Sequence, residues 1–565
     1  MPARRSHTLR FALPLLLMGI LSAGSVFCRP LLPVDETRYL SVAWEMHQSG
    51  DYLVSHINGQ TYAHKPPLLF WLINAVWCLT GPSDIAARLV GPFSAAVSLL
   101  LTFQLARRLY PESPNLPPTA GLIQCSMILW MIFSPSTMFD ALLTVCVQTS
   151  LLGAIDLSQG IYRRGVLLTG LGIGLGILSK GPVVFVHVLP VLMLPRIWSP
   201  TAVRNRIRWF FPVGTAVLFG LLVASLWAIP SAIAGGDEYG KELLWGQTAG
   251  RIVRSFAHRK PWWWYLAVSV PCTLPWIIFP GMWSTLRKAG HSPAGRFCLI
   301  WIAGALIIMS CVSGKQLHYL IPAVPGVALL FAAAIAEAPP ISRQQLIPVA
   351  LGTVLCALVP LALNQLPAFR ISAEVSPFNG WCFFPMAGCG LILLQQQRSP
   401  AMAVVRRIAV CSVLFAILLI AGLNSGFWLQ YDLTRTATAL SELNDANTPV
   451  AWVGQYQGEL NFLSRLKNPL TIINSPDELN AWLNETTGER CLILRNLLHT
   501  PSITDVAPEQ IFAGRSDVRL PEDLNAICEI THIASVHPTR DGSQLFAISV
   551  VGVQPASSTE KQPAF

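Results

Sequence analysis

The stretch from Asp35 to Pro67 carries two short polar motifs and follows the first apolar run of the chain. Asp35-Glu36-Thr37-Arg38-Tyr39 opens the stretch, His64-Lys65-Pro66-Pro67 closes it, and the apolar run before it covers Phe11–Phe27. Charged side chains set just outside a membrane span are costly unless they bind something. The stretch therefore predicts a functional loop at a membrane surface.

The composition of the chain is that of a membrane protein. Hydrophobic residues make up 53% of the 565 residues, charged residues make up 12%, and the mean hydropathy is +0.51. These values exclude an ordinary soluble protein. The net charge of +10 does not indicate nucleic-acid binding, because most basic residues lie in short loops between apolar runs, as the positive-inside rule expects.

The apolar runs predict a mainly α-helical polytopic protein with about 13 transmembrane helices. Within the loop after the first span, Thr37–Gln48 has the pattern of a short amphipathic helix, and Leu68–Thr80 is short for a crossing, which suggests an interfacial or re-entrant helix. The expected spans are Phe11–Phe27, Ile85–Leu105, Thr119–Phe133, Ala141–Leu157, Val166–Leu178, Val183–Leu194, Trp209–Ala234, one that ends near Leu286, Phe297–Val312, Leu317–Ile335, Leu346–Leu363, Phe378–Leu394 and Ile408–Phe427.

The basic residues between the spans set an orientation. With a cytoplasmic N-terminus, every basic doublet falls inside: Arg4-Arg5, Arg107-Arg108, Arg163-Arg164, the Arg204–Arg208 cluster, Arg287-Lys288 and Arg406-Arg407. The loops with the remaining polar groups then fall outside: Asp35, Lys65, Asp140, Lys180, His258 and Lys315. The positive-inside rule does not require this gathering, so we expect a polar cavity that opens outward.

The composition changes near residue 429, which predicts two domains. Residues 1–428 would form the membrane domain, with 29–84 and 235–262 as outer loops. Residues 429–565 would form a small α/β domain with a disordered tail, because strands such as Val450–Val453, Leu492–Leu494 and Leu545–Val550 alternate with polar stretches, and an odd number of spans would place it outside. In that oxidising compartment Cys491 and Cys528 would either form a disulfide or remain two free thiols.

Each candidate site residue also has a plain structural explanation. Asp35 and Glu36 sit where acids commonly cap a helix, and Asp140 opens the fourth span in the same way. Lys65 and Lys180 have the positions of snorkelling lysines. A functional explanation competes with each of these, because a transferase with a lipid phosphate as leaving group needs a carboxylate near the acceptor and cations at the phosphate.

Two further groups of residues also have both a structural and a functional explanation. Arg254 and His258 could form an ordinary interfacial basic patch, or they could bind phosphate, since a basic patch on the outer side opposes the usual charge bias. His318 and Tyr319 could anchor a helix in the interface. Lys315 precedes them on the same side.

Six motifs follow one another in the order seen in one large group of membrane enzymes: Asp35–Tyr39, His64–Pro67, Asp140–Thr144, Ser179–Pro182, His258–Tyr265 and Lys315–Pro322. The chain resembles a GT-C glycosyltransferase of the dolichyl-phosphate-mannose–protein mannosyltransferase superfamily, and within it the bacterial lipid A aminoarabinose transferases. The resemblance covers the first ten spans. It implies inverting transfer from an undecaprenyl-phosphate sugar, on the periplasmic side of the bacterial inner membrane, to lipid A or another envelope glycolipid.

The resemblance also implies roles for single residues. Asp35 and Asp140 would be the catalytic carboxylates, with Glu36, Arg38 and Tyr39 in support. The donor phosphate would meet a set of cationic and polar side chains: Lys65, Lys180, Arg254, His258, Lys315 and Tyr319. Aminoarabinose transferases usually carry a glutamate where this chain has His64. One consequence of this difference is that His64 and His258 would bind a divalent metal, either zinc or magnesium or manganese, since imidazole suits zinc.

Other functions are compatible with the same spans. The expected partners are a polyprenyl-phosphate sugar donor, a lipid or protein acceptor and membrane lipids, so a protein O-mannosyltransferase-like enzyme is one alternative. A lipid-linked sugar transporter or flippase is another. Transporters often show two related halves and broken helices near the bilayer midplane, but this sequence shows neither two halves nor buried midplane charges. Assay of the purified protein with a labelled polyprenyl-phosphate sugar separates these functions.

Overall fold

The chain forms two compact units of described residues. The computed structural model describes residues 2–199, 206–250, 259–280, 283, 287–288, 291–336, 339–365, 378–395, 397–423, 428, 431–445, 449–454, 456–475, 478, 481–482, 489–496, 528–538 and 544–553. The first unit comprises Met1–Arg29, Asp51–Ser55 and Thr61–Asn424, and the second comprises Pro30–Gly50, His56–Gln60 and Ser425–Phe565. The loop that we expected to lie wholly in the membrane domain is thus shared between the two units.

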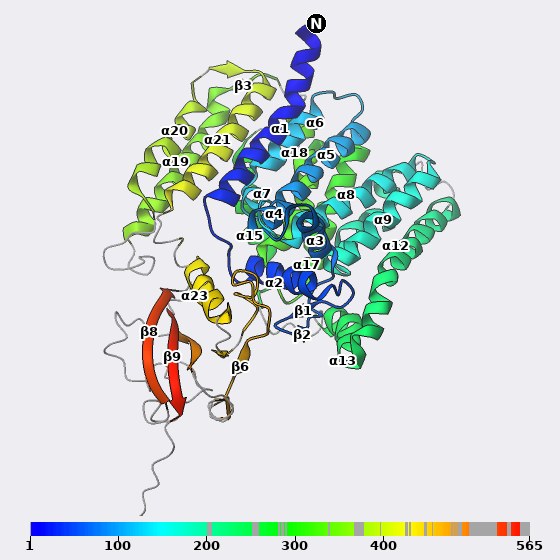
Figure 1. The fold of residues 1–565 in the computed structure, drawn as a ribbon. Helices are drawn as coiled ribbons and strands as arrows, with labels where there is room; N and C mark the ends of the chain where they lie inside the picture. Colours follow the sequence, from blue (N-terminus) through cyan, green and yellow to red (C-terminus); the bar gives the residue numbers. More distant parts are fainter. Residues whose placement is uncertain are drawn as a thin grey trace, which may run out of the picture. The chain divides into compact units, whose positions relative to one another are not determined.

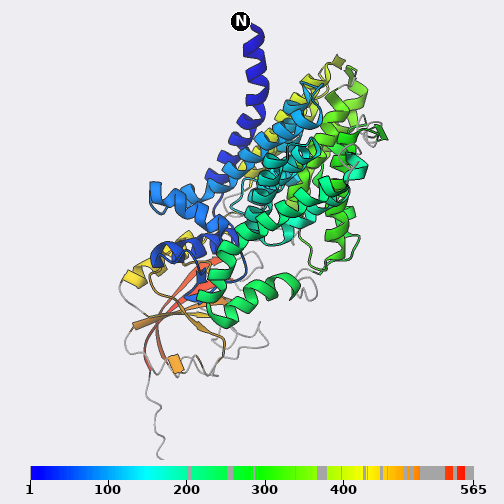
Figure 2. The same ribbon diagram turned by 90° about the vertical axis from the view of Figure 1, so that its right-hand side faces the viewer.

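The first unit is a bundle of apolar helices (Figures 1 and 2). Its main helices are α1 (Pro2–Phe27), α3 (Leu68–Thr80), α4 (Asp84–Arg88), α5 (Val90–Leu109), α6 (Leu116–Ser126), α7 (Ile128–Phe133), α8 (Phe139–Ser158), α9 (Tyr162–Lys180), α10 (Val183–Met193), α11 (Pro195–Trp198), α12 (Arg206–Ala234), α13 (Gly236–Lys241), α15 (Trp264–Cys272), α17 (Pro293–Cys311), α18 (Val324–Ala336), α19 (Arg343–Gln365), α20 (Phe383–Ile392) and α21 (Ala401–Gly422). Short irregular turns join them: η2 (Glu242–Gly250), η3 (Trp276–Ile278), η4 (Leu317–Ala323), η6 (Gly380–Cys382), and the strand pair β3 (Ile341–Ser342) and β4 (Arg398–Ser399).

Eight helices within the described residues are long and apolar enough to cross a membrane. They are Arg10–Phe27, Asp84–Leu109, Phe139–Ser158, Ile207–Ala234, Pro293–Cys311, Leu317–Ile335, Arg343–Gln365 and Ala401–Gly422, and three apolar helices are shorter, Leu68–Thr80, Val183–Met193 and Gly380–Ile392. The chain is therefore a multi-pass membrane protein. The expected third span is broken, because α6 ends at Ser126 and α7 begins at Ile128 after the extended residue Met127.

Close packing between α8, α9 and α12 fixes the ends of these helices (Figure 1). The glycines of α9 face both neighbours, and a Cβ atom on Gly172 would lie 2.5 Å from the carbonyl oxygen of Cys146 in α8. A Cβ atom on Gly170 would lie 2.8 Å from the carbonyl oxygen of Ala216 in α12. Small residues let membrane helices approach in this way. The last residue of α9, Lys180, thereby comes beside the first turn of α8.

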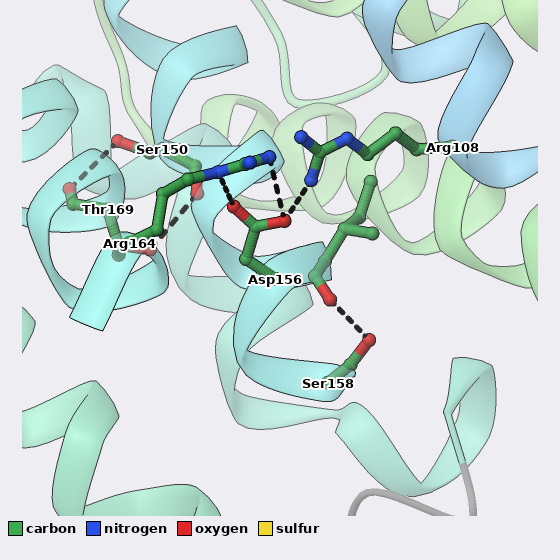
Figure 3. Close-up of polar contacts among 7 residues, drawn as sticks. Arg108, Ser150, Asp156, Ser158, Arg164 and Thr169 are labelled. Carbon is green, nitrogen blue, oxygen red and sulfur yellow. Dashed lines mark hydrogen bonds and ion pairs between the residues drawn. The ribbon is translucent and has the colours of Figure 1, made fainter. Parts of the chain in front are cut away.

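An ion cluster joins the last turns of α5 and α8 to the first turn of α9, at the ends of α8 and α9 that lie away from Lys180. Figure 3 shows Arg108 and Arg164 converging on Asp156, whose side chain is fully buried. The Arg164 Nε lies 2.7 Å from Asp156 Oδ2, and Arg108 pairs with Oδ1. Ser150 and Thr169 exchange hydroxyl-to-carbonyl hydrogen bonds of 3.2 Å between α8 and α9 (Figure 3). These contacts hold the register of the two helices.

Among its described residues, the second unit contains a five-stranded mixed sheet and the helices α2 (Asp35–Ser49) and α23 (Thr434–Asp445). The strands are β5 (Val450–Val453), β6 (Thr471–Ile473), β7 (Glu489–Asn496), β8 (Cys528–Pro538) and β9 (Gln544–Val553), in the order β6-β5-β7-β9-β8. β5 pairs parallel with β6 and β7, whereas β9 pairs antiparallel with β7 and β8 (Figure 1). The β1 strand (His56–Ile57) also belongs to this unit, and β2 (Gln60–Thr61) pairs with it across a tight turn.

The strand order speaks against the disulfide between Cys491 and Cys528. Cys491 of β7 pairs with Ser549 of β9, and Cys528 of β8 pairs with Val553 at the far end of β9. One whole strand lies between the two cysteines, so their Cα atoms are at least ~9.5 Å apart. A disulfide needs a Cα separation below about 7 Å.

Candidate functional site

A buried ion pair joins the first turn of α8 to the last residue of α9. Lys180 Nζ lies 2.5 Å from Asp140 Oδ1, and the exposed fractions of the two side chains are 9% and 1%. The same ammonium lies 4.6 Å from the centroid of the Tyr319 ring, which η4 contributes. The structure thus brings together three residues that the sequence analysis named separately.

The environment of this pair makes a purely structural role costly. Charges removed from water lose several kcal/mol of hydration each, and their attraction repays that loss only when further hydrogen bonds satisfy them. Asp140 Oδ2 is buried and has no hydrogen-bond partner among the described residues. The pair therefore has unused capacity to bind a polar group.

His187 in α10 was missed by the sequence analysis. Its side chain is fully buried, and neither ring nitrogen has a hydrogen-bond partner within the part of the chain that the structure describes. It interacts electrostatically with both Lys180 and Asp140. A histidine inside an otherwise apolar span was the signal that could have identified it.

Lys315 lies in the loop between α17 and η4, one turn before Tyr319. Its ammonium donates to the carbonyl oxygen of Val312 and, at 3.4 Å, to that of Lys260. The residue is 3% exposed, and burial lowers the pKa of Lys315, opposed by the nearby Cys311 thiol. Tyr265 braces the loop, since its hydroxyl donates to the Gln316 carbonyl at 3.1 Å. Lys315 is thus held near Tyr319 as a partly desolvated cation.

The His64-Lys65 motif leads to the same place through a row of rings. His64 is exposed and Lys65 is half-buried just before α3. The His64 ring lies 5.3 Å from Tyr62, Tyr62 lies 6.4 Å from Phe70, and Phe70 lies 5.6 Å from Phe139, which directly precedes Asp140. The row fixes the position of the motif relative to the start of α8.

The Asp35–Tyr39 motif forms its own cluster, in the second unit. The α2 helix begins at Asp35, so this residue takes the first helical position, not the N-cap position, which belongs to Val34. Asp35 Oδ1 accepts from Arg38 at 2.5 Å and from the Tyr39 hydroxyl at 3.1 Å. These spacings of three and four residues place all three side chains on one face.

The neighbouring Glu36 has a structural contact. Its carboxylate is buried and accepts the backbone N–H of Leu32 at 3.0 Å, which stabilises the turn before α2. Arg254 and His258, the remaining candidates for phosphate binding, lie outside the described residues.

The expected metal site pairs His64 with His258, and His258 lies outside the described residues. No group of three or more histidine, cysteine, aspartate or glutamate side chains arranged to hold an ion occurs among the described residues. His64 is the described member of the expected pair with His258, and its ring contacts that of Tyr62. The described residues do not by themselves make a metal site.

Comparison with known proteins gives one consistent result. The family described as dolichyl-phosphate-mannose-protein mannosyltransferase matches residues 64–229. An undecaprenyl phosphate-alpha-4-amino-4-deoxy-L-arabinose arabinosyl transferase of Pectobacterium atrosepticum is 29% identical over 399 residues, covering 64% of this chain and 70% of the relative. The enzyme of the same name from Aeromonas hydrophila is 30% identical over 315 residues, covering 54% and 56%.

A solved structure shares the fold over nearly the whole length. The crystal structure of ArnT from Cupriavidus metallidurans, bound to undecaprenyl phosphate, superposes with a TM-score of 0.74 and covers 96% of this chain and 97% of its own. The sequences are 17% identical, so this likeness shows the fold. Over residues 64–229 the chain is thus similar to the dolichyl-phosphate-mannose-protein mannosyltransferase family, over a longer stretch it is similar to the bacterial aminoarabinosyl transferases, and it shares the fold of ArnT.

Proposed function

We propose that the protein transfers a sugar from an undecaprenyl-phosphate donor to an acceptor at the periplasmic face of a bacterial inner membrane. The observation that carries the proposal is the buried pair of Lys180 and Asp140 beside Tyr319, within apolar helices of a glycosyltransferase. Ionisable residues among membrane helices are retained for function. The relatives named above use an undecaprenyl-phosphate sugar, which supports the same donor here.

The reaction requires one bond exchange at the anomeric carbon. An acceptor oxygen attacks that carbon from the side opposite the phosphate, the bond from carbon to phosphate oxygen breaks, and undecaprenyl phosphate leaves with the bonding electrons. A hydroxyl acceptor passes its proton to a carboxylate. The configuration at the anomeric carbon inverts. The protein must therefore stabilise negative charge on the leaving phosphate and positive charge on the sugar.

The lysines supply the first kind of stabilisation in this proposal. Lys180 pairs with Asp140, Lys315 lies four residues before Tyr319, and Lys65 follows His64 at the end of the aromatic row, and an ammonium is a strong partner for phosphate. Lys180 bound to phosphate would still have Asp140 as counter-ion. Asp140, at 1% exposure, then acts through Lys180 and holds its ammonium in place.

Asp35 supplies the second kind. Its side chain is 43% exposed, which leaves the carboxylate accessible to an acceptor, while Arg38 and Tyr39 hold one of its oxygens. We assign it the role of base for a hydroxyl acceptor or of electrostatic partner to the cationic sugar.

The acceptor is proposed as lipid A or another envelope glycolipid. The test is an assay of the purified protein in detergent with a labelled undecaprenyl-phosphate aminoarabinose donor and either lipid A or an unfolded protein substrate. Label in lipid A supports the proposal, and label in the protein substrate supports the mannosyltransferase-like alternative. Label that stays on the donor, with donor movement across proteoliposome membranes, would instead favour a flippase.

The metal has its own test. We propose a divalent ion at His64 and His258, on the resemblance alone. Dialysis against a chelator should then abolish transfer, and Zn²⁺, Mg²⁺ or Mn²⁺ added back singly should restore it in the wild type but not in His64→Ala. Transfer that persists after removal of the metal to below one ion per protein molecule would contradict this proposal.

A further inference from the structure

Within the second unit, one face of α2 packs on a loop of the C-terminal segment, residues 456–466, here called the docking loop. The contacts of α2 come from Arg38, Ser41, Trp44 and Glu45, whose spacing places them on one side of a helix. Asp35 lies three residues before Arg38 on the same side. Segments separated by more than 400 residues of sequence therefore form one surface.

The lower part of this contact is a set of satisfied hydrogen bonds. Ser41 Oγ donates to the Gly458 carbonyl at 2.5 Å and accepts the Phe462 N–H at 3.1 Å. Glu45 accepts from the Asn461 side chain at 2.7 Å and from the Asn58 N–H at 2.5 Å. Ser41 is fully buried, so loss of these bonds would leave unpaired polar groups.

The middle of the contact is aromatic. The Trp44 indole N–H donates to the Leu466 carbonyl at 3.0 Å, and its ring lies 6.3 Å from that of Phe462. The Arg465 guanidinium lies 3.9 Å from the Phe462 ring centroid and 5.1 Å from that of Trp44. Such stacking adds to the area buried between α2 and the docking loop. These hydrogen bonds and ring contacts fix the position of the docking loop relative to α2.

At the end of this surface, one guanidinium connects the docking loop to Asp35. Arg38 Nη1 donates to Gln457 Oε1 at 2.8 Å, and Arg38 Nη2 lies 2.5 Å from Asp35 Oδ1. The planar fork of arginine transmits orientation, because two partners on two nitrogens fix its plane. The position of Gln457 is itself set, since its backbone N–H donates to Glu459 at 2.8 Å.

We propose that Gln457 is a positioning residue for transfer, which acts through Arg38 to hold the Asp35 carboxylate in its reactive orientation. The C-terminal segment is then part of the machinery that shapes the reacting carboxylate. This inference rests on the proposed function, because it assigns Asp35 to the reaction. A catalytic group that is misplaced by a fraction of an ångström loses much of its effect, although the substrate still binds.

The test compares five variants of the full-length protein in the labelled-donor assay. Gln457→Ala removes the acceptor of the Arg38 bond and should lower kcat about tenfold, with donor KM within about twofold of the wild type. Gln457→Glu keeps an acceptor oxygen at the same reach and should recover most of that loss. Lys467→Ala changes an exposed residue just after the docking loop and serves as the matched control, with wild-type kcat.

The other two variants test the route of the effect. Arg38→Ala combined with Gln457→Ala should be no slower than Arg38→Ala alone, since both changes break one chain of contacts. Gln457→Ala should keep the unfolding temperature of Lys467→Ala, because one exposed hydrogen bond contributes little to stability. Additive losses in the double variant, or a loss of kcat that follows a lowered unfolding temperature, would overturn the positioning role. A wild-type protein that transfers no sugar from any polyprenyl-phosphate donor would instead overturn the proposed function.

Discussion

Asp35 combines exposure with restraint. Its side chain is nearly half exposed, yet one of its oxygens accepts from both Arg38 and Tyr39. A carboxylate that only stabilised the start of α2 would not need two such partners, since the helix dipole alone favours an acid there. Substitution that removes the charge but keeps the size separates the two roles.

Asp35→Asn should leave folding and membrane insertion intact and should lower the rate of sugar transfer by roughly two orders of magnitude or more. Asparagine still accepts hydrogen bonds at a helix start, so the free energy of unfolding should fall by about 1 kcal/mol or less. The measurements are turnover with labelled donor and thermal unfolding in detergent. Asp51→Asn is the control, because Asp51 accepts from the Leu53 and Val54 N–H groups and should keep its turnover. A folded Asp35→Asn protein with near-normal turnover would refute the catalytic role.

Lys65→Ala should have a different kinetic signature. Loss of a phosphate contact should raise the apparent donor KM and also slow departure of the phosphate, so kcat should fall as well. The double variant with Asp35→Asn should lose less than the product of the two single effects, because both residues act on one transition state. A Lys65→Ala enzyme with an unchanged donor KM would show that this lysine merely snorkels.

The pH dependence tests Lys315. Burial lowers the pKa of this lysine, so its ammonium loses its proton at a lower pH than an ordinary lysine does. If the ammonium holds phosphate, donor affinity should weaken as pH rises through that lowered pKa. Lys315→Arg keeps the charge and should extend tight donor binding to higher pH. Superposable binding profiles of wild type and Lys315→Arg, measured with undecaprenyl phosphate, would exclude the role.

Local spacing made part of the site predictable. Asp35, Arg38 and Tyr39 share one helical turn, so their meeting followed from the sequence. The contact between Asp140 and Lys180 depends on antiparallel packing of α8 and α9, and the role of Gln457 depends on a contact across 419 residues. No short-range pattern encodes such contacts, which is why Gln457 was missed.

At the scale of elements, helix ends depend on a few buried polar contacts. Asp156 has no exposed side-chain surface, while the side chains of Arg108 and Arg164 are 25% and 48% exposed. The buried carboxylate therefore needs the two arginines as partners, whereas the partly exposed arginines can also be solvated by water. Because the cluster lies at the end of α8 away from Asp140, it can be altered without touching the site.

Asp156→Asn should destabilise the protein by roughly 2 kcal/mol and leave kcat unchanged. This is less than the loss for a fully buried pair, since both arginines can turn toward solvent. Arg164→Ala should cost less than Arg108→Ala, because the Arg164 side chain is the more exposed. Thermal unfolding in detergent measures the order, with Arg163→Ala at the exposed neighbour as control. An Asp156→Asn protein as stable as this control would show that the cluster contributes nothing.

Hydrophobic patterning predicted most elements well. The interfacial helix expected over Leu68–Thr80 has those bounds as α3, and the amphipathic helix expected over Thr37–Gln48 is α2. The break at Met127 was missed because no proline or glycine stands at Met127 or at its direct neighbours Ser126 and Ile128. Periodicity reports burial, and it does not report where a backbone changes direction.

At the scale of the whole molecule, two compact units share the first outer loop. Residues 30–50 and 56–60 belong with the C-terminal segment, although residues 61–424, which lie between these parts of the sequence, form the helical unit. A composition boundary near residue 429 could mark where the second unit resumes, but it could not show that α2 had joined it. Because α2 lies in the outer loop and packs on the docking loop, the outer loop and the C-terminal segment lie on the same side of the membrane.

That implication makes the topology a test of the whole scheme. Eight long apolar helices and three shorter ones are described, and we predict thirteen crossings with a cytoplasmic N-terminus, because the basic doublets then all lie inside. An alkaline phosphatase fused after Gln430 should be active, whereas one fused after Gln159, four crossings along, should be silent. An even number of crossings before Gln430 would place the C-terminal segment in the cytoplasm, which would silence the first fusion. The strands of the second unit would then lie on the other side of the membrane from the outer loop that contains α2. In that case α2 could not pack on the docking loop. A silent Gln430 fusion would therefore refute the topology, the docking of α2 and the periplasmic site together.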